Sequence, residues 1–180
     1  MNSIRHDLDR SLGDIRRTRE LIHEAFLVLL RHTLSTADVG EVPVLALRGG
    51  LLGFRAASIV YARPIGLVAP HKIGTNIITS YGDIPDSSCY LLIDTIANTG
   101  KTILGCLSAM RDNSERSAIR VAFLFGTQDA CDEISASGMS EEVHAGWTDY
   151  ERGVDHRLIG IDYDAGDYAM LDTSGHRISW

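Results

Sequence analysis

The sequence contains few cysteines, and their positions exclude two kinds of scaffold. Only three are present, Cys89, Cys106 and Cys131, and no two of them form a C-x-x-C pair. An odd number of cysteines at wide spacing argues against both a disulfide framework and a zinc site. We therefore expect each cysteine to be a small buried apolar residue in a reducing compartment.

Long apolar runs and an excess of positive charge are also missing. Residues 1–10 lack the apolar core of a signal peptide, and the longest apolar stretch, near residues 25–30, is too short to cross a bilayer. Lys and Arg number 17 against 24 Asp and Glu, a net charge of −7. Nucleic acids and anionic membranes do not attract such a protein. We expect a cytoplasmic protein that binds neither, although a local basic pocket for a small phosphate ligand is compatible with this charge.

What the sequence does contain is the composition of an ordinary globular domain. It has 180 residues, of which 44% are hydrophobic and 23% charged. Residues 3–35 have a helical apolar spacing, with Ile15, Ile22, Phe26 and Leu29 three, four or seven apart, typical of a scaffold or dimer helix. We predict an N-terminal helical region over residues 1–40 and an α/β domain over residues 41–180, together a single domain overall.

Short apolar runs alternate with helical patterns over the rest of the chain. The predicted buried strands are 42–47, 65–69, 89–93, 119–125 and 142–147, and residues 75–79 are predicted to form a hairpin arm. The predicted helices are 51–61, 99–111 and 129–136. This alternation predicts an α/β fold with a central, mostly parallel sheet flanked by helices on both faces.

Two loops follow strands of this predicted sheet, and each carries polar or glycine residues. They are Arg48–Gly50 and Asp94–Thr102. In parallel sheets ligands bind at the carboxyl ends of the strands, so we expect both loops in one crevice. The second loop opens a helix whose free N–H groups and dipole favour an anion. An acid at the mouth of such a cradle, Asp94, suits ribose hydroxyls or a magnesium ion.

The second loop is compatible with two other interpretations. Gly100-Lys101-Thr102 matches the last three positions of a nucleotide P-loop, but Thr95 stands where that motif requires its first glycine. A simple strand-to-helix turn is the other, although an acid, two threonines and a glycine exceed what a turn needs.

Three segments together resemble type I phosphoribosyltransferases, and the uracil phosphoribosyltransferases in particular. The loop from Asp94 to Thr102 is similar to that family's ribose-phosphate loop. Residues 42–51, VPVLALRGGL, are similar to its pyrophosphate-loop segment, V-P-I-L-R-A-G-L, and residues 164–167 match its D-A-G-D. The segments stand in the family's order, and the resemblance covers roughly residues 40 to 170. It implies a small C-terminal hood and transfer of a phosphoribosyl group from 5-phosphoribosyl 1-pyrophosphate to a nucleobase.

The resemblance also implies roles for individual residues. The expected catalytic residues are Asp94 and Arg48. The 5-phosphate would be bound by Asn98, Thr99, Gly100, Lys101 and Thr102, and the pyrophosphate by Arg48, Gly49, Gly50 and Lys72. Ribose and base would contact Ile161, Asp162, Tyr163, Asp164 and Asp167. Mg²⁺ is the expected cofactor, with Asp164 as its candidate ligand, and a homodimer or higher homo-oligomer is expected. A peptide bond within Arg48–Gly50 is expected to be strained, with a cis bond as one form.

Departures from the family's pattern leave the acceptor base open. Lys101 replaces the family's usual glycine. Thr95 follows Asp94 at a position where many relatives have a second acid. Uracil enzymes also lack this second acid. The hood's Pro-Gly and Leu-Gly are replaced by Gly160-Ile161-Asp162-Tyr163. The acceptor could therefore be uracil or an unusual heterocycle of specialised metabolism. A non-catalytic, nucleotide-sensing regulator on the same fold is the alternative function.

Overall fold

The structure is a computed structural model that describes residues 1–11, 14–36, 40–73, 76–82, 84–113, 117–153 and 158. Its elements in chain order are α1 (Asn2–Ser11), α2 (Ile15–Ser35), β1 (Val42–Ala46), the 3-10 helix η1 (Gly49–Gly53), α3 (Phe54–Tyr61), β2 (Gly66–Ile73), β3 (Asn76–Tyr81), β4 (Cys89–Ala97), α4 (Lys101–Asn113), β5 (Ala118–Gly126), α5 (Gln128–Ala136) and β6 (Glu142–Trp147). Within the described residues, no helix has both the length and the apolar character needed to span a membrane.

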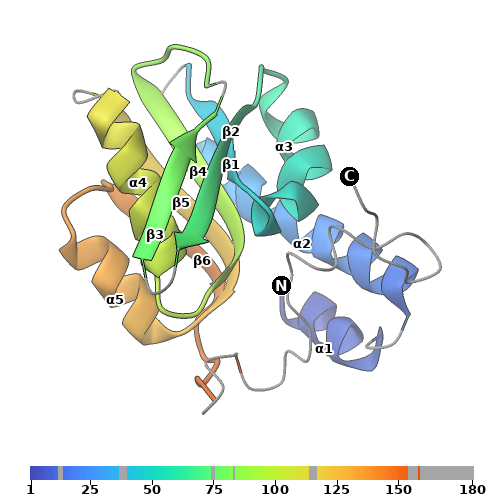
Figure 1. The fold of residues 1–180 in the computed structure, drawn as a ribbon. Helices are drawn as coiled ribbons and strands as arrows, with labels where there is room; N and C mark the ends of the chain where they lie inside the picture. Colours follow the sequence, from blue (N-terminus) through green and yellow to red (C-terminus); the bar gives the residue numbers. More distant parts are fainter. Residues whose placement is uncertain are drawn as a thin grey trace.

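A six-stranded sheet forms the centre of the molecule, in the order β3-β2-β1-β4-β5-β6 (Figure 1). Every neighbouring pair is parallel except β2 and β3, which are antiparallel. The prediction of an α/β fold with a central, mostly parallel sheet is confirmed. The hairpin arm predicted near residue 75 is β3, on the outer edge of this sheet.

Helices cover both faces of the sheet, which explains why its strands are continuous apolar runs. Successive side chains of β4 point to opposite faces: Leu91 and Ile93 pack with Phe26 of α2, whereas Leu92 packs with Ile103 of α4. Figure 1 shows α2 and α3 on one side of the sheet and α4 and α5 on the other. Each face therefore has its own core, and the two cores share the sheet between them.

Three predicted boundaries were wrong. The helical region 3–35 is two helices, because Asp14 caps α2: its Oδ1 accepts a hydrogen bond from Arg17 N at 3.0 Å. The helix predicted over 51–61 begins as the 3-10 helix η1. Strand β4 does not end before Asp94 but continues to Ala97, because it stays paired with β5 as far as Gly126.

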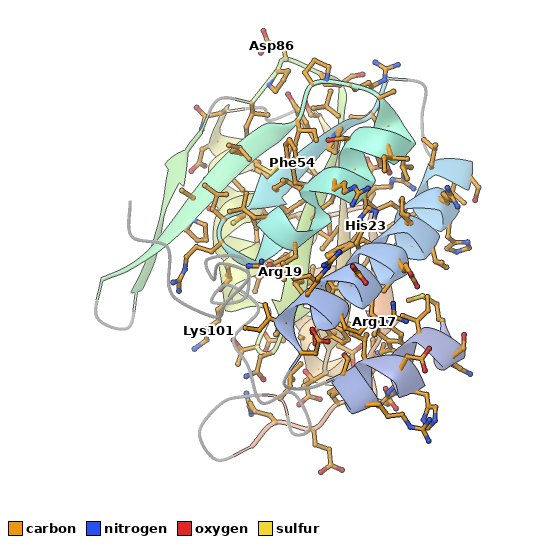
Figure 2. All side chains as sticks on the ribbon, turned by 90° about the vertical axis from the view of Figure 1, so that its right-hand side faces the viewer. Arg17, Arg19, His23, Phe54, Asp86 and Lys101 are labelled. Atoms are coloured by element: carbon orange, nitrogen blue, oxygen red, sulfur yellow. The ribbon has the colours of Figure 1, made fainter. Side chains whose placement is uncertain are left out.

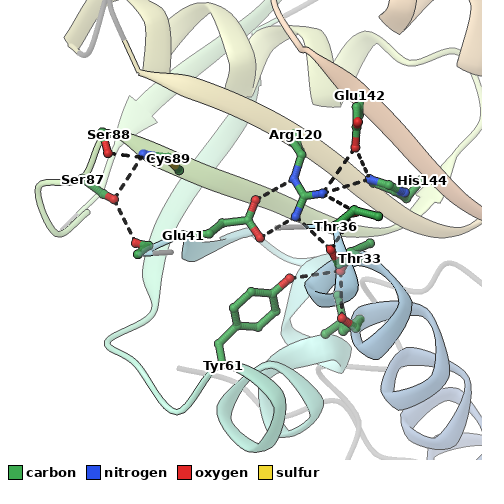
Figure 3. A network of polar contacts seen from close by, with 12 residues as sticks. Thr33, Thr36, Glu41, Tyr61, Ser87, Ser88, Cys89, Arg120, Glu142 and His144 are labelled. Carbon is green, nitrogen blue, oxygen red and sulfur yellow. Dashed lines mark hydrogen bonds and ion pairs between the residues drawn. The ribbon is translucent and has the colours of Figure 1, made fainter. Parts of the chain in front are cut away.

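A buried ion pair joins elements at the amino ends of the strands (Figure 3). Arg120, near the start of β5, donates from Nε and Nη2 to the two carboxylate oxygens of Glu41 at 2.7 and 2.8 Å. The two side chains are only 8% and 2% exposed. Arg120 Nη2 also donates to Thr33 O at 3.0 Å, at the end of α2. The carboxyl-terminal end of α2 therefore lies at the amino edge of the sheet, and its amino-terminal half points toward the opposite edge.

Further polar side chains complete this network. Glu142 Oε2 lies 3.3 Å from Arg120 Nη1 and 3.0 Å from His144 Nε2. Tyr61 OH, at the end of α3, lies 3.0 Å from Thr33 Oγ1. Burial raises the pKa of Tyr61 well above its usual range, so this hydroxyl stays protonated and available for hydrogen bonding. The network ties both helices of this face to strands β1, β5 and β6.

Candidate functional site

The carboxyl ends of β1, β4 and β5 meet at the edge opposite this network, because the three strands are parallel neighbours. The turn after β1 contains Arg48, whose side chain is exposed, and leads directly into η1. The peptide bond Leu47–Arg48 is cis. This bond lies one residue before the two in which an unusual geometry was predicted, so that prediction was wrong in position.

Close contacts join the Arg48 turn to β4. Thr95 Oγ1 donates a hydrogen bond to Gly49 O at 2.7 Å, and Thr95 N donates to Asp94 Oδ1 at 2.7 Å. A Cβ atom added at Gly49 would collide with Asp94 Oδ1, and one at Gly50 would lie 2.5 Å from Ile93 O. Only glycine fits in these positions, and its absent side chain lets the turn lie against the Asp94 carboxylate. The two loops therefore lie at one edge, as their positions after parallel strands predict.

Residues 98–100 form a bend between β4 and α4. Gly100 has a φ of +68°, in the left-handed region that favours glycine. Thr127, at the start of α5, holds the bend from the other side by donating its hydroxyl to Asn98 O at 3.0 Å. Helix α4 begins at Lys101, so its first N–H groups and the positive end of its dipole face this edge. An anion bound here would be stabilised by both.

The charges at this edge differ in exposure. Lys101 is exposed, and the first turn of α4 contains no acidic residue. Asp94 is 5% exposed and lies under the Gly49 turn. Cys106 is buried below it: burial raises the pKa of its thiol far above the usual range, and the nearby Asp94 carboxylate raises it further. Cys106 is therefore a protonated packing residue and not a nucleophile.

The structure places some of the predicted site residues and not others. Arg48–Gly50 and Asp94–Thr102 come together, as described above. The backbone of Lys72 lies in β2, opposite Ile77 of β3, but its side chain is outside what the structure describes. Outside the described residues lie all the predicted ribose, base and metal contacts of the hood, Ile161, Asp162, Tyr163, Asp164 and Asp167. In the described part of the chain, no three His, Cys, Asp or Glu side chains form a group that could hold a metal ion.

Sequence reasoning missed two features of this edge. Thr95 links the loops, yet in the sequence it stood out only as the place where a second acid is missing. At the ends of β5 and β6 the rings of Phe125 and Trp147 stack with centroids 5.2 Å apart. Trp147 Nε1 is buried and has no hydrogen-bond partner among the residues that the structure describes. Two aromatic residues near the ends of neighbouring strands were the available signal for this cluster.

No family model and no curated protein matches the sequence. Several solved structures do match in fold. The AQ2163 protein from Aquifex aeolicus has a TM-score of 0.76 at 15% identity, covering 92% of this chain and 93% of that one. Helicobacter pylori xanthine-guanine-hypoxanthine phosphoribosyltransferase has a TM-score of 0.57 at 17% identity, covering 72% and 85%. Orotate phosphoribosyltransferase from Aeropyrum pernix has a TM-score of 0.56 at 19% identity, covering 76% and 75%.

This chain has the type I phosphoribosyltransferase fold. At these identities the likeness establishes the fold alone. In this fold the two contacting loops occupy the carboxyl edge of a doubly covered parallel sheet, where such sheets bind ligands.

Proposed function

We propose that this protein is a type I phosphoribosyltransferase, related to the uracil enzymes. It would join a nucleobase, uracil or a related heterocycle, to 5-phosphoribosyl 1-pyrophosphate and release pyrophosphate. The observation that carries the proposal is the contact between the two loops, in which Thr95 bonds Gly49 and the Asp94 carboxylate lies against the same glycine. The fold and the three sequence segments support it independently.

The 5-phosphate would be bound at the start of α4. The bend at Gly100 turns the backbone so that the first N–H groups of the helix are available to an anion. Thr99 and Thr102 would add hydroxyl donors, Asn98 an amide, and Lys101 a positive charge. A phosphate at this position would also offset the electrostatic cost of a cation at the positive end of a helix dipole.

The reacting end of the substrate would lie between the loops. Bond breaking at the anomeric carbon develops positive charge on the ribose ring, and the Asp94 carboxylate would stabilise it while binding ribose hydroxyls. Arg48 and the amides of Gly49 and Gly50 would bind the departing pyrophosphate. The protein's contribution is thus positioning and charge stabilisation without a covalent intermediate.

Magnesium fits this site as an ion that arrives on the substrate. Mg²⁺ is commonly held by one or two carboxylates together with substrate phosphates, and Asp94 supplies one carboxylate at this edge. When bound, the ion would neutralise charge on the pyrophosphate leaving group. Asp164 remains a proposed second ligand. We also propose a cytoplasmic homo-oligomer, with residues 41–180 as the catalytic unit.

Calorimetry with 5-phosphoribosyl 1-pyrophosphate, with and without Mg²⁺, tests the binding step. Pyrophosphate release with uracil, substituted pyrimidines and other nitrogen heterocycles then tests the reaction. We expect binding and release with at least one of these acceptors. Binding without release for any acceptor would favour a nucleotide-sensing regulator, and folded protein that does not bind the ligand would rule out the proposal.

A further inference from the structure

The amino-terminal half of α2 carries an unusual amount of positive charge for its position. Its first two turns contain Arg16, Arg17 and Arg19, and no acid is present in the first turn. Cations at a helix amino terminus oppose the helix dipole. Glu20 lies within 3.4 Å of Arg16 and 3.5 Å of Arg17, so these two arginines share one carboxylate. This end of α2 points toward the ligand edge, because the other end is held at the amino edge by Arg120.

Two contacts fix how η1 and α3 lie along α2. At the far end, Tyr61 OH of α3 lies 3.0 Å from Thr33 Oγ1 of α2. Earlier in both segments, a Cβ at Gly53 would lie 3.3 Å from the ring of Phe26. The two segments therefore run in the same direction. Gly49, at the start of η1, must lie beside a part of α2 that precedes Phe26.

The same contacts identify which flank of α2 faces η1. Phe26 lies on this flank, and so does His23: burial lowers its pKa, and the nearby Arg55 of α3 lowers it further. Arg19 is four residues before His23 and seven before Phe26, so helix periodicity places it on the same flank. Figure 2 shows Arg19 on the side of α2 toward η1, and Arg17 on the other side.

The position of Arg19 along α2 also matches the position of Gly49 along η1. Arg19 lies roughly 10 Å before Phe26, at 1.5 Å per residue of α-helix. Gly49 lies roughly 8 Å before Gly53, at 2 Å per residue of 3-10 helix. Arg19 is therefore level with the Arg48–Gly49 turn. Helix α2 covers one face of the sheet, whereas the phosphate bend leads into α4 on the other face.

We propose that Arg19 binds the pyrophosphate group of 5-phosphoribosyl 1-pyrophosphate, as a second guanidinium beside Arg48. The inference rests on the proposed function and adds to it a residue from the N-terminal helix. A guanidinium suits this task because its planar fork donates two parallel hydrogen bonds to phosphate oxygens. The 5-phosphate would bind at the start of α4, which covers the other face of the sheet, so we expect Arg19 to act on the pyrophosphate alone.

Three variants test the proposal: Arg19→Gln, Arg19→Lys and the control Arg17→Gln, which removes the same charge from the same turn on the opposite flank. Calorimetry would measure three ligands, 5-phosphoribosyl 1-pyrophosphate, inorganic pyrophosphate and ribose 5-phosphate, each with Mg²⁺. We expect Arg19→Gln to weaken the binding of 5-phosphoribosyl 1-pyrophosphate and of pyrophosphate about tenfold or more, and to leave the affinity for ribose 5-phosphate unchanged. The affinities of Arg19→Lys should lie between those of the parent protein and of Arg19→Gln, because lysine keeps the charge but lacks the planar fork of the guanidinium. Arg17→Gln should bind all three ligands like the parent protein.

Each outcome decides the proposal. Equal binding of the substrate by Arg19→Gln and Arg17→Gln would overturn it and leave the proposed function standing. An equal loss of ribose 5-phosphate would also overturn it, since Arg19 would then act on the 5-phosphate or on the fold. If the parent protein binds pyrophosphate through Arg19 but not the phosphoribosyl substrate, the pyrophosphate subsite stands and the proposed function fails. A parent protein that binds none of the ligands contradicts both.

Discussion

The amino and carboxyl edges of the sheet differ in how their charged side chains are buried and paired. At the amino edge, Arg120 is buried and donates to Glu41 through two hydrogen bonds, with Glu142 beside it. At the carboxyl edge, Lys101 is exposed at the first residue of α4 and makes no ion pair with any described residue. Its two loops meet at Gly49, which lies against the Asp94 carboxylate and accepts a hydrogen bond from Thr95 Oγ1.

The difference follows from what desolvation costs. A buried charge must be paired and hydrogen-bonded within the protein, and the partners of Arg120 come from α2, from Glu41 just before β1, and from β6. Such a network holds the elements together, but its charged groups are already bonded to one another and are not available to a ligand. At the carboxyl edge, Lys101 is exposed and the first N–H groups of α4 face outward, where an anion could meet them. We therefore expect substitutions at the amino edge to change mainly stability and substitutions at the carboxyl edge to change mainly ligand binding.

The largest expected effect is on stability, from Arg120→Met. This change leaves the Glu41 carboxylate, 2% exposed, without its cation, and removing one partner of a buried pair costs about 3–5 kcal/mol. Urea unfolding followed by circular dichroism measures the change. Arg5→Met is the control: its ion pair with Asp149 is exposed and should contribute about 1 kcal/mol or less. Similar losses in the two variants would show that the amino-edge network has no special weight.

At the carboxyl edge, Asp94→Asn should reduce activity much more than stability. Loss of a charge contact made in the transition state costs about 2–4 kcal/mol, or about a hundredfold or more in turnover number. Steady-state kinetics and unfolding of the same preparation measure both. An unchanged turnover number in the folded variant would remove Asp94 from the catalytic residues.

Lys101→Met should affect stability and binding in opposite directions. Without ligand, removing a cation from the positive end of α4 should stabilise the protein by about 0.3–1 kcal/mol. With the phosphoribosyl substrate, binding should weaken, because the charge that meets the 5-phosphate is gone. Thermal unfolding with and without ligand measures both changes, and Lys101→Arg should behave like the parent protein. A loss of stability without ligand would contradict this account of the edge.

The smallest effect is expected from histidine protonation. Burial lowers the pKa of His144 below its usual 6.5, and Arg120 lowers it further, although Glu142 opposes the shift. The unfolded chain then binds the proton more readily than the folded one. Stability from this source is therefore present above pH 6.5 and is lost as the pH falls through that value toward the lower folded pKa.

Unfolding at several pH values between about 7.5 and 5.5 should show this loss, and His144→Gln should reduce it. The pKa of His23 is lowered in the same way, by burial and by Arg55, so His23→Gln should also reduce the slope. If neither variant changes the slope, protonation of His144 and His23 does not set the pH dependence of stability.

The strands were predictable from sequence because their burial leaves a direct signature. A strand covered on both faces is a continuous apolar run, as in β4 and β5, and strand β6 was predicted with the residues the structure assigns. The position of the two candidate loops also followed, because the carboxyl ends of parallel strands share one edge. Helix breaks were less predictable: the cap at Asp14 is a local signal that the apolar periodicity of the surrounding helix obscured.

What only the tertiary structure decided are contacts between elements far apart in sequence. Arg120 and Glu41 are 79 residues apart, and neither position carries a local pattern that names the other. Arg19 lies at the same height along the helix axis as the Arg48 turn because of how α2 packs along η1 and α3. Apolar periodicity does not specify this packing. Sequence by itself determined the class of fold and the edge that the two candidate loops share, because burial and strand direction act locally. Which side chains meet across that edge was decided by packing, because it depends on the relative placement of whole elements.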